Sequence, residues 1–65
     1  MFIAFSDKES SYIYKANNIV TVQYIQGKDF FIIQFNDGTI QEYLYYTPAH
    51  CLNAFISVRD QLKGV

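Results

Sequence analysis

Short apolar runs separated by polar breaks fill the first 46 positions, a pattern typical of β-strands rather than of long helices. The clearest example covers residues 29–46, where two apolar runs, 30–35 and 40–46, flank the segment Asn36-Asp37-Gly38-Thr39. An Asp-Gly pair between such runs favours a tight hairpin turn, because Gly adopts positive φ without steric cost. We therefore predict a β-hairpin here and expect the rest of the chain to be organised around it.

Three further segments have β character. Residues 2–5 and 12–14 are short apolar runs separated by a polar stretch, which predicts a first hairpin. After Asn17-Asn18, residues 19–26 are rich in β-branched and aromatic side chains, and Gly27-Lys28 fits a two-residue turn leading into residue 30. Residues 19–46 are thus predicted to form a three-stranded meander.

The pattern changes to helical after residue 46. Thr47 can accept a bond from a free amide of the first helical turn, Pro48 suits the first helical position, and Gly64 ends the segment. Apolar residues recur between them at spacings of three and four, forming a stripe that can cover one sheet face: Cys51, Leu52, Phe55, Ile56, Val58 and Leu62. The predicted fold class is α+β, a single domain over residues 1–65 with four to five antiparallel strands and one C-terminal helix packed on one face.

The register of the central hairpin has two solutions. A two-residue turn at Asp37-Gly38 places Phe31 opposite Leu44, but it brings Glu42 to the helix-facing side, where an unpaired carboxylate is costly. A three-residue turn with Gly38 in a bulge shifts the pairing by one residue and aligns Phe31 with Tyr43. We favour the two-residue turn, with the second register as the alternative.

The favoured register leaves one face of the sheet without a covering helix. This face is neutral, rich in Gln and Tyr, and low in charge, as the buried centres of protein interfaces are. An ordinary solvated sheet surface has a similar composition, and we favour the interface over it. The candidate contact residues are Gln23, Phe30, Ile32, Gln34, Gln41, Tyr43 and Tyr45.

Composition adds a reason to expect a partner. A 65-residue chain buries only about 60% of the surface that its unfolded form exposes, yet this chain is 51% apolar, with six Tyr and six Phe. Its single cysteine, Cys51, cannot form an intrachain disulfide, so oligomerisation is the remaining way to stabilise so small a domain. We predict a homo-oligomer.

Charge and hydropathy disfavour two classes of partner. The net charge is −1, and the five Lys and Arg residues are spread along the chain, so no basic cluster is present to neutralise the phosphates of duplex nucleic acid. The apolar segment 1–5 is far shorter than a signal sequence or a membrane span. We expect a cytoplasmic protein with no membrane partner.

The inventory of chemically reactive side chains is small. His50, the only histidine, precedes Cys51 in the first predicted helical turn, but adjacent helical residues project about 100° apart and do not form a nucleophile and base pair. The acidic residues lack the spacing of metal ligands, and the three glycines are isolated, unlike a phosphate-binding loop. We expect no catalytic residue, metal or cofactor, and hence no enzyme.

Two family resemblances support the predicted fold. Ile19, Tyr24, the segment 35–38, Tyr43, Pro48 and Phe55 resemble the KTSC domain, a small module of phage and bacterial proteins sometimes fused to lysyl-tRNA synthetases. The family's C-terminal motif of serine, glycine and aromatic-Phe-Asn is absent, since residues 57–62 continue as helix, and any function of that motif does not transfer. An N-terminal hairpin, a strand start at Asn18-Ile19, a Gly turn and a terminal helix also make the whole chain similar to small flagellar-associated FlbD-type proteins. Both resemblances imply a compact sheet with a C-terminal helix.

These observations favour a small non-enzymatic binding or assembly module that acts as a homo-oligomer through its aromatic and Gln-rich sheet face. One alternative is a phage-type accessory protein that binds and inhibits a host protein or defence enzyme. Another is a protein that binds a small polar ligand or nucleotide at subunit interfaces, where aromatic faces can stack on a base.

Overall fold

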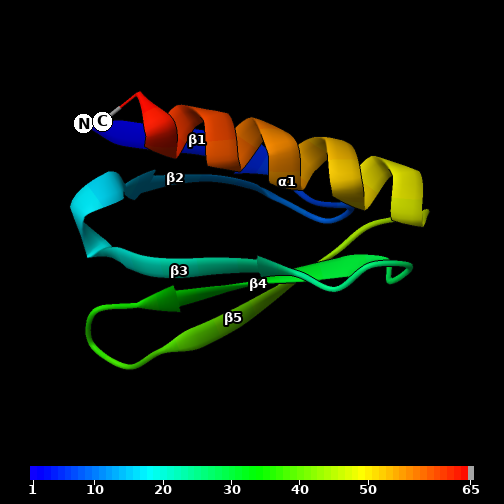
Figure 1. Cartoon of the computed structure of the whole chain (residues 1–65), viewed down its shortest axis with the longest axis horizontal. Helices are drawn as coiled ribbons and strands as arrows, with labels where there is room; N and C mark the ends of the chain where they lie inside the picture. The colour runs from blue at the N-terminus through cyan, green and yellow to red at the C-terminus, as the bar shows by residue number, and fades with distance from the viewer. Residues whose placement is uncertain (65) are drawn as a thin grey trace.

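The computed structural model describes residues 1–64, in which five strands and one α-helix form two layers (Figure 1). The elements are β1 (Phe2–Ser6), β2 (Ser11–Lys15), a 3-10 turn (Ala16–Asn18), β3 (Ile19–Tyr24), β4 (Phe30–Phe35), β5 (Ile40–Leu44) and α1 (Pro48–Lys63). The predicted α+β class, the antiparallel strands and the C-terminal helix are confirmed.

The strands form two separate antiparallel sheets. β1 and β2 make a two-stranded hairpin, and the second sheet has the order β3-β4-β5. Figure 1 shows the hairpin and α1 in one layer, with the three-stranded sheet as the other layer. The helix and the hairpin therefore lie on the same side of the three-stranded sheet and together cover that face.

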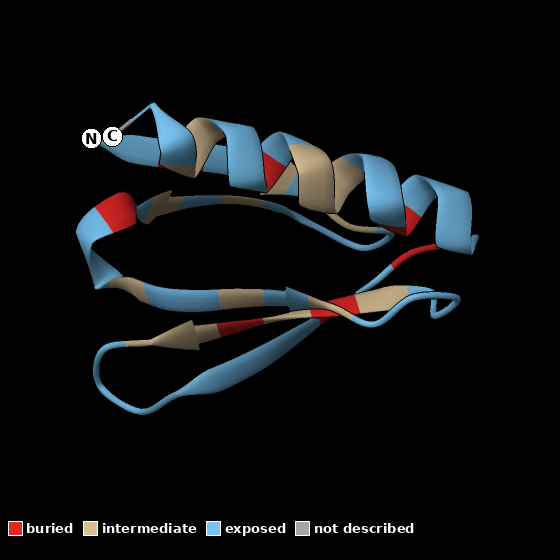
Figure 2. Cartoon of the chain, viewed as in Figure 1, coloured by how far each residue is buried: buried red, intermediate tan, exposed pale blue. Residues whose placement is uncertain are grey.

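Most aromatic side chains meet between these two layers. The ring centroid of Phe5, from β1, lies 4.9 Å from that of Tyr43 and 5.6 Å from that of Phe31. We call this cluster the aromatic layer; it comprises Phe5, Tyr12, Tyr14, Phe31, Phe35, Tyr43 and Tyr45. Figure 2 shows the buried positions along the facing sides of the two layers. Most of the aromatic side chains are thus used inside the domain, whereas Phe2 and Tyr46 are exposed.

The turn between β4 and β5 contains three residues. The Gly38 amide donates to the Phe35 carbonyl (3.0 Å), the Phe35 amide donates to the Thr39 carbonyl (2.9 Å), and Gly38 has a φ of 90°. The Thr39 amide also donates to a carboxylate oxygen of Asp37 (2.8 Å), and this bond lowers the pKa of Asp37. This geometry is a type I turn followed by a glycine bulge.

The favoured two-residue turn is therefore wrong, and the alternative register is observed. Phe31 pairs with Tyr43, and Glu42 pairs with Ile32. The shift by one residue moves Tyr43 into the aromatic layer and places the Glu42 side chain in solvent. The burial penalty of a carboxylate and the apolar surface of Tyr43 both favour this register.

The start of β3 contains a bulge, and the turn after β3 differs from the prediction. A bulge between Ile19 and Thr21 turns Val20 outward, where it is exposed, and brings Ile19 to the core side opposite Phe35. In the turn that follows, the Lys28 amide donates to the Ile25 carbonyl (3.0 Å), so residues 26 and 27, rather than 27 and 28, are the central pair.

The helix begins and packs as the sequence predicts. Thr47 Oγ1 accepts a hydrogen bond from the His50 amide (3.1 Å), and Pro48 occupies the first turn. Phe55 stacks on Tyr24 with ring centroids 5.5 Å apart. Within residues 1–64, no helix has the length and apolar character needed to cross a membrane.

The helix also binds the edge of β1. The side-chain amide of Gln61 donates to the Ala4 carbonyl and accepts from the Ala4 amide, both at 2.8 Å. This pair of bonds reproduces what a neighbouring strand would offer to Ala4, at the middle of the free edge of β1.

Gly38→Ala is expected to lower the free energy of unfolding by about 1–2 kcal/mol, because an L-residue is strained at this positive φ. No atom lies within 4 Å of the added Cβ, so backbone strain is the only new cost. Gly64→Ala is the matched control, since Gly64 has a φ of −77°. Urea denaturation of both variants tests this, and equal losses would contradict the three-residue turn.

Candidate functional site: an open sheet face

One face of the three-stranded sheet points away from α1 and the hairpin, and no other element of residues 1–64 lies over it (Figure 1). The pairing of β3, β4 and β5 places alternate residues of each strand on this side. We call this surface the open face; it comprises Thr21, Gln23, Phe30, Ile32, Gln34, Ile40, Glu42 and Leu44.

Apolar side chains form much of the open face. Phe30 lies opposite Leu44, and Ile40 lies opposite Gln34. Ile40 is 61% exposed and Leu44 is 42% exposed, while Phe30 and Ile32 are half-buried by their neighbours. An antiparallel sheet that covers a core with one face normally presents polar residues on the other, so this apolar content is unusual.

The polar part of the open face is nearly uncharged. Thr21 Oγ1 donates to the side-chain oxygen of Gln34 across β3 and β4 at 3.5 Å, and Gln23 is exposed beside them. Glu42 is the one ionised side chain of this surface as defined, and it lies on the edge strand β5. The surface can therefore be covered by another apolar surface with little charge desolvation.

Four of the seven predicted contact residues share the open face: Gln23, Phe30, Ile32 and Gln34. The placement of Tyr43 and Tyr45 on this surface is wrong, because both side chains are buried in the aromatic layer. Gln41 pairs with Ile33 on the core side of the sheet, although its own side chain is exposed near the end of β5. The three-residue turn accounts for all three displacements.

The same shift brings two residues to the open face that the sequence prediction missed. Ile40 and Leu44 replace Gln41, Tyr43 and Tyr45 as the contributions of β5, with Glu42 between them. The sequence signal that identifies Ile40 and Leu44 is the alternation of side chains along β5, because both residues must share the face of Glu42 once Glu42 is assigned to the solvent side.

Both buried tyrosines have bonded hydroxyl groups. The Tyr43 hydroxyl donates to the Tyr14 hydroxyl (2.9 Å), and the Tyr45 hydroxyl donates to the Ser6 carbonyl (2.7 Å). Burial raises the pKa of both phenols well above the ordinary value, and the bond to Tyr14 adds to the increase at Tyr43. These hydroxyls join the hairpin to the three-stranded sheet and serve structure rather than contact with a partner.

The only thiol and the only imidazole lie in different environments. Cys51 is completely buried, and burial, reinforced by the negative charge of Asp29, raises the pKa of its thiol. His50 is exposed, and its Nδ1 lies 3.0 Å from Thr47 Oγ1 at the start of α1. This arrangement withholds the sulfur from solvent. Among the described residues, no three His, Cys, Asp or Glu side chains gather as metal ligands do.

Comparisons with protein-family models, with curated proteins and with solved structures find no match to this chain. The resemblances to the KTSC domain and to FlbD-type proteins therefore stay predictions from the residues.

The buried tyrosines predict a loss of stability in alkali. Unfolded tyrosines ionise near pH 10, whereas Tyr43 and Tyr45 keep their protons in the folded state, so the unfolded state binds fewer protons there. The free energy of unfolding should fall above about pH 10, by up to about 1.4 kcal/mol per pH unit for each buried phenol. Urea denaturation at a series of pH values measures this slope.

Tyr43→Phe isolates one phenol in that experiment. Above about pH 10, the free energy of unfolding of this variant should fall less steeply with pH than that of wild type. At neutral pH, loss of the hydrogen bond should lower the free energy of unfolding by about 1 kcal/mol. Tyr46→Phe is the control, because Tyr46 is 76% exposed. An unchanged slope in Tyr43→Phe would show that this phenol ionises as freely in the folded protein as in the unfolded one.

Cys51 should react slowly with a thiol reagent in the folded protein. We expect labelling on the order of 100-fold slower at neutral pH than in denaturant, because the sulfur becomes accessible only on opening of the structure. His50→Ala should leave the native rate unchanged. A rapid native reaction that His50→Ala slows would instead reveal an activated nucleophile.

Proposed function

We propose that the protein is a non-enzymatic binding module that associates with a second copy of itself through the open face. The observation that carries this proposal is the second apolar surface of a sheet whose other face already covers the core. Phe30, Ile32, Ile40 and Leu44 give this surface an apolar centre, and neutral Gln and Thr side chains surround it.

The open face suits pairing with itself. Two sheets pack face to face when both present apolar side chains with few charges, and a two-fold axis makes the same patch serve both partners. Glu42 lies on the edge strand β5, so the axis can place the two carboxylates at opposite margins of the interface. Gln23 and Gln34 can donate and accept hydrogen bonds across the contact.

The size of the open face sets the expected strength of association. Three strands spaced about 4.8 Å apart and about five residues long cover a footprint of roughly 250 Å². A standard stable interface buries about 800 Å² on each partner. We therefore expect a weak dimer, with a dissociation constant on the order of 100 µM, that forms mainly at high local concentration.

The outer face of the hairpin is the competing surface. It exposes Phe2 and Ile13, the latter at 71%, but Lys15 lies opposite Phe2, and Ser6 and Ser11 complete this side. The hairpin surface is only two strands wide and carries a charge next to its aromatic ring. The open face is broader and more continuous.

Ile40→Lys tests the proposal, with Ile13→Lys as a matched control that adds the same charge to the competing surface. Sedimentation equilibrium across about 10–500 µM should show wild type and Ile13→Lys dimerising, with Ile40→Lys at least ten-fold weaker. Both positions are largely exposed, so both variants are expected to fold. A wild type that stays monomeric over this range, or loss of the dimer in Ile13→Lys alone, would contradict the proposal.

A further inference from the structure

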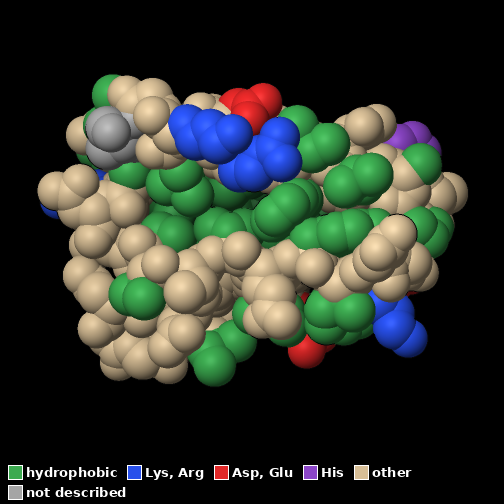
Figure 3. Space-filling view, in the orientation of Figure 1, with side chains coloured by type: hydrophobic (Ala, Val, Ile, Leu, Met, Phe, Trp, Pro, Cys, Tyr) green, Lys and Arg blue, Asp and Glu red, His purple; other side chains and the backbone are tan. Residues whose placement is uncertain are grey.

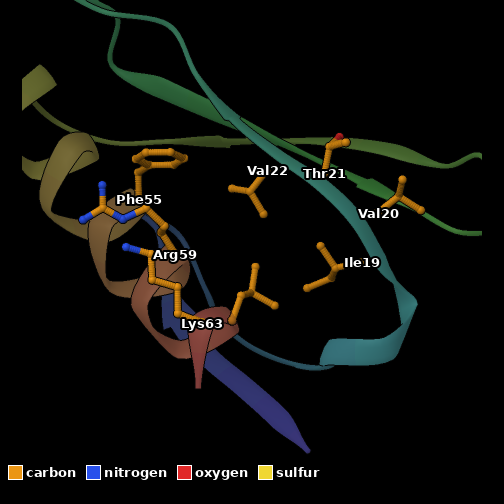
Figure 4. Close-up of a pocket in the computed structure, with 8 residues that line it drawn as sticks. Ile19, Val20, Thr21, Val22, Phe55, Arg59 and Lys63 are labelled. Atoms are coloured by element: carbon orange, nitrogen blue, oxygen red, sulfur yellow. The ribbon is translucent and has the colours of Figure 1, made fainter. Parts of the chain in front are cut away.

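A groove at the edge of the sheet separates β3 from the C-terminal half of α1, and Thr21 of the open face is among its lining residues (Figure 4). It has a volume of about 390 Å³. Ile19 and Val22 of β3 and Phe55 and Leu62 of α1 supply apolar walls, and Arg59 and Lys63 of α1 also line the groove. Figure 3 shows an apolar strip below a group of basic side chains on this side of the molecule. The groove therefore combines an apolar interior with a basic margin.

The β3 side of the groove is an unpaired strand edge. β3 is the outermost strand of its sheet. The Ile19 amide donates to the Ala16 carbonyl of the 3-10 turn, and within residues 1–64 the backbone of residues 20–24 bonds only to β4. By contrast, Gln61 occupies the edge of β1, and the Lys8 amide donates to the Leu44 carbonyl at the end of β5 (3.1 Å). Along β3, alternate residues direct both N–H and C=O toward the groove, so backbone groups there can pair with an added strand.

The charge of the groove specifies what kind of strand fits it. The chain contains five basic residues, and two of them, Arg59 and Lys63, line the groove. Asp60 lies 3.4 Å from the Arg59 guanidinium, but both side chains are about half exposed, so this pair is weak and an acidic ligand can compete with it. β3 carries no charged residue, so β3 of a second copy would leave both basic groups without an acidic partner.

We propose that this groove binds an extended, acidic segment of a partner protein, which adds to β3 as a fourth strand. Residues four apart on a helix are separated by about 6 Å along its axis, and residues two apart on a strand by about 6.6 Å. Two acidic side chains at alternate positions therefore match Arg59 and Lys63. A further alternate residue, apolar, enters the space beside Phe55, next to the acidic residue that faces Arg59. Main-chain hydrogen bonds to β3 supply affinity, and the side chains supply selectivity.

A short synthetic peptide provides the test. The probe is the acetylated, amidated hexapeptide Val-Thr-Glu-Thr-Glu-Thr, and the matched control replaces both Glu with Gln. NMR titration of isotope-labelled protein should show a dissociation constant below about 1 mM for the acidic peptide and at least ten-fold weaker binding for the control. The amide shifts should concentrate in residues 19–22 and 55–63.

Variants of the protein assign the contact. Arg59→Gln/Lys63→Gln should weaken binding of the acidic peptide about ten-fold or more and leave the control peptide unaffected. Lys15→Gln/Lys28→Gln removes the same charge elsewhere and should change neither titration. If Arg59→Gln/Lys63→Gln melts at a lower temperature than wild type, the proposal is judged only from the binding of the two peptides to the wild-type protein. No binding at about 5 mM, equal binding of both peptides, or shifts confined to the open face would overturn the proposal.

Discussion

The two bonded tyrosine hydroxyls hold the layers of this protein in one arrangement. Burying an aromatic ring contributes about 1.5–3 kcal/mol, but leaving its hydroxyl unsatisfied costs about 1–3 kcal/mol, so an unpaired buried Tyr gains almost nothing. Tyr43 and Tyr45 therefore stabilise the core only where Tyr14 and the Ser6 carbonyl meet them, at 2.9 and 2.7 Å. That requirement fixes the position of the hairpin over the larger sheet, and with it which sheet face is left uncovered.

Local sequence signals predicted the strands and the helix, whereas contacts between residues far apart in the sequence determine how these elements pair and pack. Thr47 and Pro48 sufficed to locate the start of α1, because helix capping involves only neighbouring residues. The length of the turn at Gly38 did not follow from its own sequence, since Asp-Gly fits both two-residue and three-residue loops. What decides the register is Tyr43, whose hydroxyl partner lies 29 residues earlier. Four of the seven predicted contact residues were placed correctly because β3 and β4 alternate in the same way under either register.

The two surfaces proposed for binding have separate structural origins. The open face exists because the hairpin and α1 both lie on the other side of the three-stranded sheet. The groove lies between β3 and α1, whereas Gln61 of α1 bonds to the edge of β1. One side of the sheet can thus contact a second copy while its margin pairs with an extended segment, and neither surface draws on the buried aromatic layer.

The bonds between Gln61 and Ala4 also bear on the order in which the chain acquires its structure. They join residues 57 positions apart, so Ala4 of β1 lacks these bonds until the last turns of α1 have formed. Contacts of this range slow folding, and an uncovered strand edge invites pairing with other nascent chains. Gln61 thereby links formation of the last turns of α1 to protection of the β1 edge from misassembly, a role that a side chain confined to its own helix could not fulfil.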